Sequence, residues 1–550
     1  MELEYLFNKL IKKFNLLELE LDGDISEEEQ SNILSVLYSK NKLTIWKIEK
    51  LLNYVEFVPG IDALLVRIRT LSIGLARAYS IRRALEKVRS RGKKVFIYLE
   101  SPGNIEYFIG SVADIIYMPP TSTLNLIGLN FELSFLKNLF DKVGIEAEIK
   151  SIGEFKSAGE KFTRNSMSES NRIMMESISQ DISSGFVDYL SKSRNMDKKY
   201  ITDSINNGPY TALEAKGRNL IDDTCYENGL EDKISIYVNE KLSIIKHDKF
   251  LKIISVSEKY KNIKSKVLGK KNEIAIIPFT GLITIGENKG TGNMKILGAR
   301  SFIKQIKMLG NKKSINSVVI RVSSPGGSAL ASDIIWNEIK ELSLKKTVIV
   351  SMSDYAASGG YFISLAGKKI ISSPFTLTGS IGVISGKFNF VHLYKKLGVS
   401  FDSIKFGSNS DIYSLNKKLT EAQGEKIESL MRALYKDFVG KVAKERNITE
   451  DNAQNAAQGR VWTGSQAQSV NLVDGQGNIF DSVLSAVDES GMEDKNNFTV
   501  KYYAIKQSLQ LSTLGKGFFL QEHYSNISNW IELLRNEICL TLSPYIFKIR

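Results

Sequence analysis

Residues 317–339, SVVIRVSSPGGSALASDIIWNEI, contain a run of β-branched apolar residues, a Ser-Pro-Gly-Gly corner and an amphipathic stretch. The run of valine and isoleucine is typical of a strand buried on both faces, and the stretch after the glycines has the period of a helix. The same order recurs in the first half of the chain at LLVRI (64–68), followed by SIRRALEKV (80–88). Strands that alternate with helices predict an α/β fold with mostly parallel sheets flanked by helices.

The two halves of the chain repeat one another at a nearly fixed offset. YFI (107–109) matches YFI (361–363), 254 positions later. After a two-residue deletion the offset is 252, where LID (220–222) matches LVD (472–474). Self-similarity at one period indicates an internal duplication.

The duplication divides the chain into four parts. We predict two tandem α/β domains, at 1–245 and 273–495, joined by a lysine-rich linker at 246–272 and followed by a C-terminal tail at 496–550. A length of 550 residues, with 43% hydrophobic and 25% charged side chains, supplies enough apolar material for two such cores.

The composition argues against several classes of partner. The net charge is +13, but the lysines are spread along the chain, so we expect no nucleic-acid partner. Cys225 and Cys539 stand in unrelated contexts without metal-ligand spacing, which predicts neither a disulfide framework nor a zinc site. No window reaches the roughly 18 apolar residues of a membrane-spanning helix, and the N-terminus lacks a signal-peptide core. We therefore expect any membrane contact to be peripheral or supplied by a partner.

A serine and three glycines stand at the ends of two predicted strands. Gly326 and Gly327 follow the strand SVVIRV, and Ser358 and Gly359 follow the strand that begins TVIVSM. Glycine corners leave backbone N–H groups open, and two such donors beside a hydroxyl stabilise the oxyanion of acyl transfer. Either corner alone is also common as a plain turn, but the two together predict a serine nucleophile with an oxyanion hole.

No histidine is a recognisable base for this serine. His247 falls in the predicted linker, His523 in the tail, and His392 on a predicted helix whose repeat position is Asn138. This pattern argues against a Ser-His-Asp triad. A buried lysine is the alternative, because burial lowers the pKa of the amine towards neutrality.

The repeat narrows the choice among the lysines. Lys156 aligns with Ser410 of the second half, whereas Ser358 aligns with Asn104 of the first. An arbitrary lysine is more often a solvent-facing residue, but here each half holds one group that the other lacks. We predict that Lys156 and Ser358 meet in an active site between the domains.

Four motifs together resemble the signal peptide peptidase A family, also called protease IV, in its long tandem-domain form. They are SPGGS (324–328), DYAASGGYFIS (354–364), PFTLTGSIGV (374–383) and GEFKSAGEKFTR (153–164), and the resemblance covers about residues 15–495. It implies the fold shared by the Clp protease proteolytic subunit and the crotonases. It also implies a serine endopeptidase that degrades signal peptides left in the membrane after secretion.

The resemblance assigns roles to individual residues. It implies Ser358 as the nucleophile, Lys156 as the general base, and Ser380 of the TGSIG motif as the serine that orients the lysine amine. The oxyanion hole that it implies is formed by the backbone N–H groups of Gly359, Gly326 and Gly327. This mechanism requires no metal ion and no organic cofactor.

Assembly and location are expected from the resemblance alone. Family members form bowl-shaped oligomers, so we expect a homotetramer that admits small or unfolded peptides, signal-peptide remnants among them. We expect a bacterial, membrane-associated protein, with the cytoplasm as the alternative, because long members carry an N-terminal membrane anchor and this sequence begins almost directly at its first predicted strand. The segment 526–550 mixes apolar and basic residues and can lie on a membrane surface or pack on the body.

Two other functions are left open by the sequence. A crotonase-like enzyme would use the same backbone oxyanion hole on acyl-CoA thioesters without a serine nucleophile, so a Ser358→Ala variant would stay active. A non-catalytic scaffold would keep the fold and lose the chemistry, and it would not react with a serine-directed fluorophosphonate probe.

Overall fold

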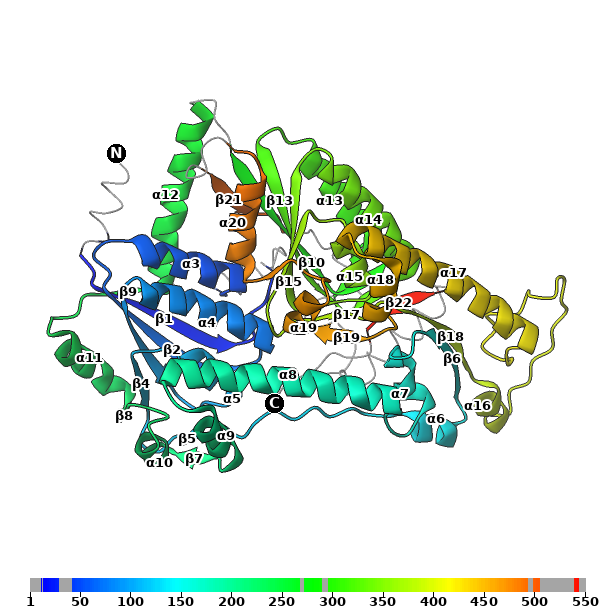
Figure 1. The fold of residues 1–550 in the computed structure, drawn as a ribbon, viewed down its shortest axis with the longest axis horizontal. Helices are drawn as coiled ribbons and strands as arrows, with labels where there is room; N and C mark the ends of the chain where they lie inside the picture. The colour runs from blue at the N-terminus through cyan, green and yellow to red at the C-terminus, as the bar shows by residue number, and fades with distance from the viewer. Residues whose placement is uncertain are drawn as a thin grey trace.

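The first half of the chain is built on a six-stranded sheet, with the strands in the order β8-β4-β3-β2-β1-β9 (Figure 1). Their bounds are β1 Leu16–Gly23, β2 Ala63–Leu71, β3 Lys94–Leu99, β4 Ile115–Met118, β8 Asp223–Thr224 and β9 Ile244–Lys246. Every pairing in this sheet is parallel, as the apolar runs separated by helices predict. The computed structural model describes residues 11, 13–28, 42–267, 272–288, 295–492, 498–504 and 539–543.

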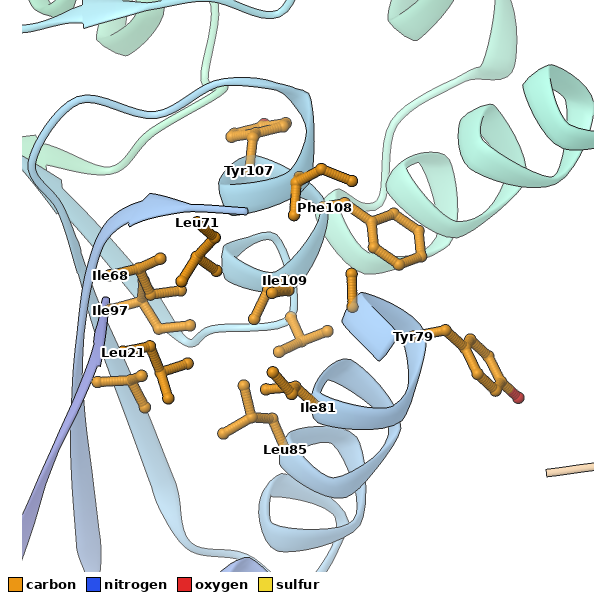
Figure 2. Packing of buried hydrophobic residues seen from close by; sticks show 14 of the residues in the cluster. Leu21, Ile68, Leu71, Tyr79, Ile81, Leu85, Ile97, Tyr107, Phe108 and Ile109 are labelled. Atoms are coloured by element: carbon orange, nitrogen blue, oxygen red, sulfur yellow. The ribbon is translucent and has the colours of Figure 1, made fainter. Parts of the chain in front are cut away.

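Helices cover both faces of this first sheet. One face carries α3 Ile45–Phe57, α4 Leu75–Ser90, α5 Asn104–Gly110 and α8 Glu169–Arg194, and the other carries α11 Leu230–Val238. Figure 2 shows Ile68 and Ile97 of the sheet facing Ile81 and Leu85 of α4. All four side chains are buried, and burial of one such side chain contributes roughly 1.5–3 kcal/mol of hydrophobic stabilisation.

The second half is built on an eight-stranded sheet with the central order β19-β17-β15-β13-β10-β21, and with β16 between β15 and β20. The strand bounds are β10 Glu273–Thr280, β13 Ile315–Ser324, β15 Thr347–Ala357, β16 Lys369–Ser372, β17 Leu377–Gly379, β19 Val461–Thr463, β20 Gly475–Gln476 and β21 Thr499–Tyr502. The helices on its faces are α13 Ala299–Gly310, α14 Ala329–Ser343, α15 Gly359–Ser364, α17 Glu421–Arg446, α18 Glu450–Ala456, α19 Gly464–Ser469 and α20 Ile479–Glu489. The pairings are parallel except that of β17 with β19.

Equivalent residues of the two halves make the same buried contact. The hydroxyl of Tyr107 donates to Leu220 O at 2.8 Å, and the hydroxyl of Tyr361 donates to Leu472 O at 2.9 Å. These are the residues that the sequence repeat pairs at offsets of 254 and 252. The predicted fold class, two α/β units that arose by duplication, is confirmed.

A third sheet joins the halves, in the order β12-β11-β14-β22-β18-β6. Its strands are β12 Ile296–Gly298, β11 Leu282–Thr284, β14 Gly326–Ser328, β22 Leu540–Leu542, β18 Val383–Asn389 and β6 Glu146–Ile152. β6 belongs to the first half and pairs antiparallel with β18 of the second. This pairing carries the segment that follows β6 into contact with the second half.

The predicted linker and tail both contribute regular structure. α12 (His247–Val267) occupies most of the predicted linker, and its Phe250 and Ile254 are buried in the core of the first half. The tail supplies β21 beside β10 and β22 beside β14. Of the segment 526–550, only residues 539–543 lie within the described part of the chain. No helix among the described residues is long and apolar enough to cross a membrane.

A buried ion network ties the first half to β13 and β15. Arg321 of β13 is 1% exposed and donates to both carboxylate oxygens of Glu27, at 2.8 and 3.0 Å. Ser353 also donates to Glu27, and Arg77 of α4 donates from Nε to Asp354 at 2.6 Å. Burial alone would raise the pKa of Glu27, but Arg321 and Ser353 outweigh burial and hold this pKa below its usual value. Glu27 and Arg77 of the first half thus bind two consecutive residues of β15, Ser353 and Asp354.

We predict that Arg321→Met destabilises the folded protein by about 3–5 kcal/mol, because it leaves the Glu27 carboxylate buried without its ion partner. The measurement is urea unfolding followed by circular dichroism. Lys137→Met is the control, because it removes a surface ion pair with Asp141, and it is expected to change the unfolding free energy by less than about 1 kcal/mol. Equal stability of the two variants would show that the network does not stabilise the fold.

Candidate active site

Ser358 lies at a sharp corner between a strand and a helix. β15 ends at Ala357, and α15 begins at Gly359. The backbone of Ser358 has φ 55° and ψ −111°, which a residue with a Cβ rarely adopts, and its N–H donates to Gly379 O at 2.7 Å. Backbone strain of this kind is concentrated at functional sites, where surrounding contacts hold one side chain in a defined direction.

Lys156 reaches this corner from the first half of the chain. It follows β6, and its side chain is only 2% exposed. Its Nζ lies 2.8 Å from Ser358 Oγ, 2.8 Å from Ser380 O and 3.0 Å from Ser380 Oγ. The structure therefore brings together the three side chains that the sequence analysis named, one from the first half and two from the second.

Burial lowers the pKa of Lys156 well below its ordinary value of 10.5. The oxygens around Nζ are two hydroxyls and one carbonyl, and within the described residues no carboxylate forms an ion pair with this amine. A charged ammonium would have no counter-ion here, so the neutral amine is favoured. A neutral amine at hydrogen-bond distance from a hydroxyl is the arrangement that a general base needs.

A loop of the second half holds the Lys156 segment in place, and the sequence analysis did not identify it. Phe155 N–H donates to Gln458 O at 2.7 Å, and Gly459 N–H donates to Ile381 O at 2.7 Å. Gly459 has φ 75°, and a Cβ on it would lie 2.5 Å from the Cβ of Lys156. Only glycine fits here. No sequence motif marks this glycine, because its role depends on the contact between positions 156 and 459.

Gly326 and Gly359 lie side by side next to the corner at Ser358. A Cβ on Gly326 would lie 2.9 Å from Gly359 N, so the two backbones are in close contact. Gly326 has φ 106°, which favours glycine, and its N–H donates to Ser324 Oγ at 3.2 Å. The Gly326 N–H would have to leave Ser324 before it and the Gly359 N–H could both donate to one oxygen atom beside Ser358.

Gly327, the third glycine of the predicted oxyanion hole, is packed between two strands. It pairs with Ile283 of β11 on one side and with Thr541 of β22 on the other. A Cβ on Gly327 would lie 2.2 Å from Ile283 O. The close approach of these strands is sufficient to require glycine at this position.

The remaining candidate residues lie elsewhere. His247 begins α12, and His392 lies in α16 (Val391–Lys396); within the described residues neither histidine hydrogen-bonds to Ser358. His523 lies outside the described residues. No group of three or more His, Cys, Asp or Glu side chains that could hold a metal ion occurs in the part of the chain that the structure describes.

Two family models match this chain. The model of peptidase family S49 matches residues 87–237 and 340–493, which together make up more than half of the chain. The model of the Clp protease family matches residues 291–377. The S49 model matches once in each half, as the duplication requires. The Clp protease match agrees with the parallel sheet and the Gly-rich corners of the second half.

The chain is also similar to three named proteases over most of its length. It is 32% identical over 480 residues to the chloroplastic serine protease SPPA of Arabidopsis thaliana, which covers 86% of this chain and 69% of that protein. It is 29% identical over 451 residues to Protease 4 of Haemophilus influenzae, covering 78% of this chain and 71% of that protein. It is 30% identical over 418 residues to Protease 4 of Salmonella typhi, covering 74% of this chain and 66% of that protein. Taken with the two S49 matches, these relatives show that the chain belongs to peptidase family S49 and is an SppA-type serine protease.

Proposed function

We propose that this protease is an endopeptidase with Ser358 and Lys156 as its catalytic dyad, and that it degrades cleaved signal peptides and other small or unfolded peptides. The observation that carries the proposal is the 2.8 Å separation of Lys156 Nζ and Ser358 Oγ in a buried site between the halves. A hydroxyl beside a neutral amine can lose its proton as it attacks, which makes it a competent nucleophile. The signal-peptide substrates are proposed from the family resemblance of the sequence motifs.

In the proposed reaction, neutral Lys156 takes the proton of Ser358 while Oγ attacks the carbonyl carbon of the scissile bond. The carbonyl oxygen becomes an oxyanion, which accepts hydrogen bonds from the backbone N–H groups of Gly359 and of the Gly326-Gly327 corner. Protonated Lys156 then gives its proton to the leaving amine as the C–N bond breaks. A water molecule, deprotonated by the same lysine, hydrolyses the acyl-enzyme and regenerates Ser358. This route uses no metal ion or organic cofactor.

Ser380 is the proposed positioning residue for the base. It is fully buried, and it offers Lys156 Nζ two acceptors, its carbonyl oxygen at 2.8 Å and its hydroxyl at 3.0 Å. Two oxygens from one residue restrict the direction of a long, flexible side chain. The amine is thereby kept pointing at Ser358.

We further propose a homotetramer with peripheral contact to a membrane, as the family resemblance implies. Val399, Phe401, Ile404 and Phe406 are exposed on the segment after α16, and neighbouring large apolar side chains on a surface support an assembly contact. The net charge of +13 supports attraction to an anionic membrane surface.

The dyad is tested by replacing each member. Ser358→Ala and Lys156→Met are each expected to lower kcat/KM for a fluorogenic signal-peptide-like substrate by at least about 10³-fold with an unchanged circular dichroism spectrum. Lys161→Met is the matched control, because burial also lowers the pKa of this lysine, but no hydrogen bond in the described residues joins it to Ser358. The control should keep wild-type activity. An active Lys156→Met variant would require another base, and an active Ser358→Ala variant would favour crotonase-like chemistry.

Activity is expected to rise with pH through the pKa of Lys156. Burial lowers this pKa well below 10.5, so kcat/KM should increase tenfold per pH unit below the pKa and level off at a pH well under 10.5. The free energy of unfolding is also expected to rise with pH. The unfolded chain keeps the Lys156 proton up to about pH 10.5, whereas the folded chain releases it at a lower pH. The unfolding free energy of the wild type should therefore rise between the two pKa values relative to Lys156→Met. A flat pH-rate profile would contradict the neutral-lysine mechanism.

Ser380→Ala is expected to lower kcat about tenfold with little change in KM, because Nζ loses one hydrogen bond worth about 1.4 kcal/mol and keeps the backbone carbonyl. Ser372→Ala is the matched control, since it removes a buried hydroxyl that has no partner within the described residues. Steady-state kinetics on both variants makes the comparison. A change confined to KM would show that Ser380 acts on substrate binding and does not orient the base.

A further inference from the structure

Arg460 holds its guanidinium between two aromatic rings. Its Cζ atom lies 5.2 Å from the centre of the Phe155 ring and 4.4 Å from the centre of the Trp462 ring. At these distances a guanidinium is attracted by the negative face of an aromatic ring. We call these three side chains the Arg460 stack.

The two rings of the Arg460 stack belong to different halves of the chain. Phe155 packs against the core of the first half, and Trp462 packs against the core of the second. The indole Nε1–H of Trp462 donates to Ala456 O at 2.9 Å, which fixes the orientation of that ring. Arg460 also donates from Nη2 to Ser177 Oγ of α8 at 3.3 Å. The stack therefore joins the two halves through side chains.

The Arg460 stack lies directly beside the proposed base. Phe155 is the residue before Lys156, and Arg460 is the residue after Gly459, whose backbone is in contact with Lys156. The carbonyl oxygen of Arg460 accepts from Ser380 N–H at 2.7 Å. Arg460 is thus bonded through its backbone to the serine that contacts the amine, and stacked through its side chain on the neighbour of Lys156.

No ion pair accounts for the position of the Arg460 side chain. Burial lowers the pKa of its guanidinium, and within the described residues no carboxylate pairs with it. Arg446 of α17 shows the usual arrangement, because it donates to both carboxylate oxygens of Asp474, at 2.7 and 2.9 Å. The Arg460 cation is partly removed from water without such a counter-ion, and the two rings hold it instead.

The duplication does not repeat the Arg460 stack in the first half. One of its rings keeps an aromatic counterpart, but the guanidinium and the other ring have none. The repeat positions of Trp462, Arg460 and Phe155 hold Tyr210, Gly208 and Asn409, respectively. The first half supplies the phenyl ring and the second half supplies the guanidinium, in the same way as each half supplies one member of the proposed dyad.

We propose that Arg460 is a positioning residue for Lys156, and that its stack with Phe155 and Trp462 keeps the segment of the base in place against the second half. This proposal rests on the proposed function, because it requires Lys156 to be the general base. A displacement of about 1 Å in an active site is enough to cost about 10²-fold in rate. Loosening of this segment would also admit water to the amine, and water stabilises its charged form.

The first experiment replaces Arg460 with leucine in the full chain, which removes the guanidinium from between the rings. For a fluorogenic signal-peptide-like substrate, kcat is expected to fall about 10- to 100-fold with KM unchanged, because Arg460 acts through the base. The inflection of the pH profile of kcat/KM is expected to move up by about one pH unit, because water at the Lys156 amine favours its charged form. Circular dichroism checks that the variant is folded.

Arg218→Leu is the matched control. Arg218 lies over the ring of Tyr210, the repeat counterpart of Trp462, at 4.9 Å, and within the described residues no hydrogen bond joins it to the segment of Lys156. This control should keep the wild-type kcat and pH profile.

An unchanged inflection in a folded Arg460→Leu variant, or a loss confined to KM, would overturn the proposal. A purely structural role for Arg460 would lower the amount of folded enzyme and leave the inflection where it is. If Arg460→Leu does not fold, Phe155→Leu decides, because it removes one ring of the same stack. An inflection equal to that of the wild type would then overturn the proposal.

The second experiment is a double-mutant cycle, which tests whether Arg460 acts through Phe155. It compares kcat for the wild type, Arg460→Leu, Phe155→Leu and the double variant. Residues in contact have effects that do not add, so Arg460→Leu is expected to change kcat by less than about threefold in the Phe155→Leu background. An equal loss in both backgrounds would show that Arg460 acts independently of Phe155, and the proposal would be wrong.

Failure of the Arg460 stack and failure of the proposed dyad give different results. If the dyad is wrong, Lys156→Met retains turnover, and no change at Arg460 can act through this lysine. If the dyad is right and the stack is wrong, Lys156→Met is inactive while Arg460→Leu keeps the wild-type inflection.

Discussion

The antiparallel pairing of β6 with β18 is the contact on which the rest of the active site depends. Seven residue pairs, from Glu146↔Asn389 to Ile152↔Val383, fix the first half against the second. A slip of one residue along a strand moves the chain by about 3.4 Å and turns every side chain to the opposite face. Such a shift would exceed the tolerance of the hydrogen bond between Lys156 and Ser358, so the register of this pairing also sets the geometry of the proposed dyad.

The two halves support this pairing by packing into each other's cores. Phe375, Leu377 and Val461 of the second half are buried in the core of the first, and Trp46 of the first is buried with α20 and the second sheet. α8 of the first half runs beneath both halves in Figure 1 and bonds to the second half through Asp181, which accepts from Thr463 Oγ1 at 2.5 Å. The halves are therefore duplicated in sequence but interlocked in structure, and Lys156 and Ser358 lie where they meet.

The features that could be predicted from the sequence are those recorded in local patterns or in the repeat. The alternation of apolar runs with amphipathic stretches predicted the parallel sheets. The repeat predicted Ser358 and Lys156 as a pair, because their repeat positions hold Asn104 and Ser410, so each half has one group that the other lacks. The third sheet could not be predicted, because β6, β18 and β22 lie far apart in the sequence and are neighbours only in space. The helix α12 was predicted as a linker because its sequence is rich in lysine. Among its described side chains, only Phe250 and Ile254 are fully buried in the core. Gly459 could not be identified from the sequence, because the need for glycine there comes from its contact with Lys156 in the folded chain.

The burial of Lys156 has a consequence for how the enzyme is made. The amine has a low pKa only because the β17–β18 turn and the loop at 457–460 enclose it, and both belong to the half of the chain that leaves the ribosome last. Before that half is made, the exposed lysine keeps its ordinary basicity and is protonated, and Ser358, its proposed partner, has not yet been synthesised. With Ser358 and Lys156 as the proposed dyad, an unfinished chain would carry no protease activity with which to damage itself or its neighbours. The division of the proposed dyad between the two halves would make completion of the fold the event that switches the enzyme on.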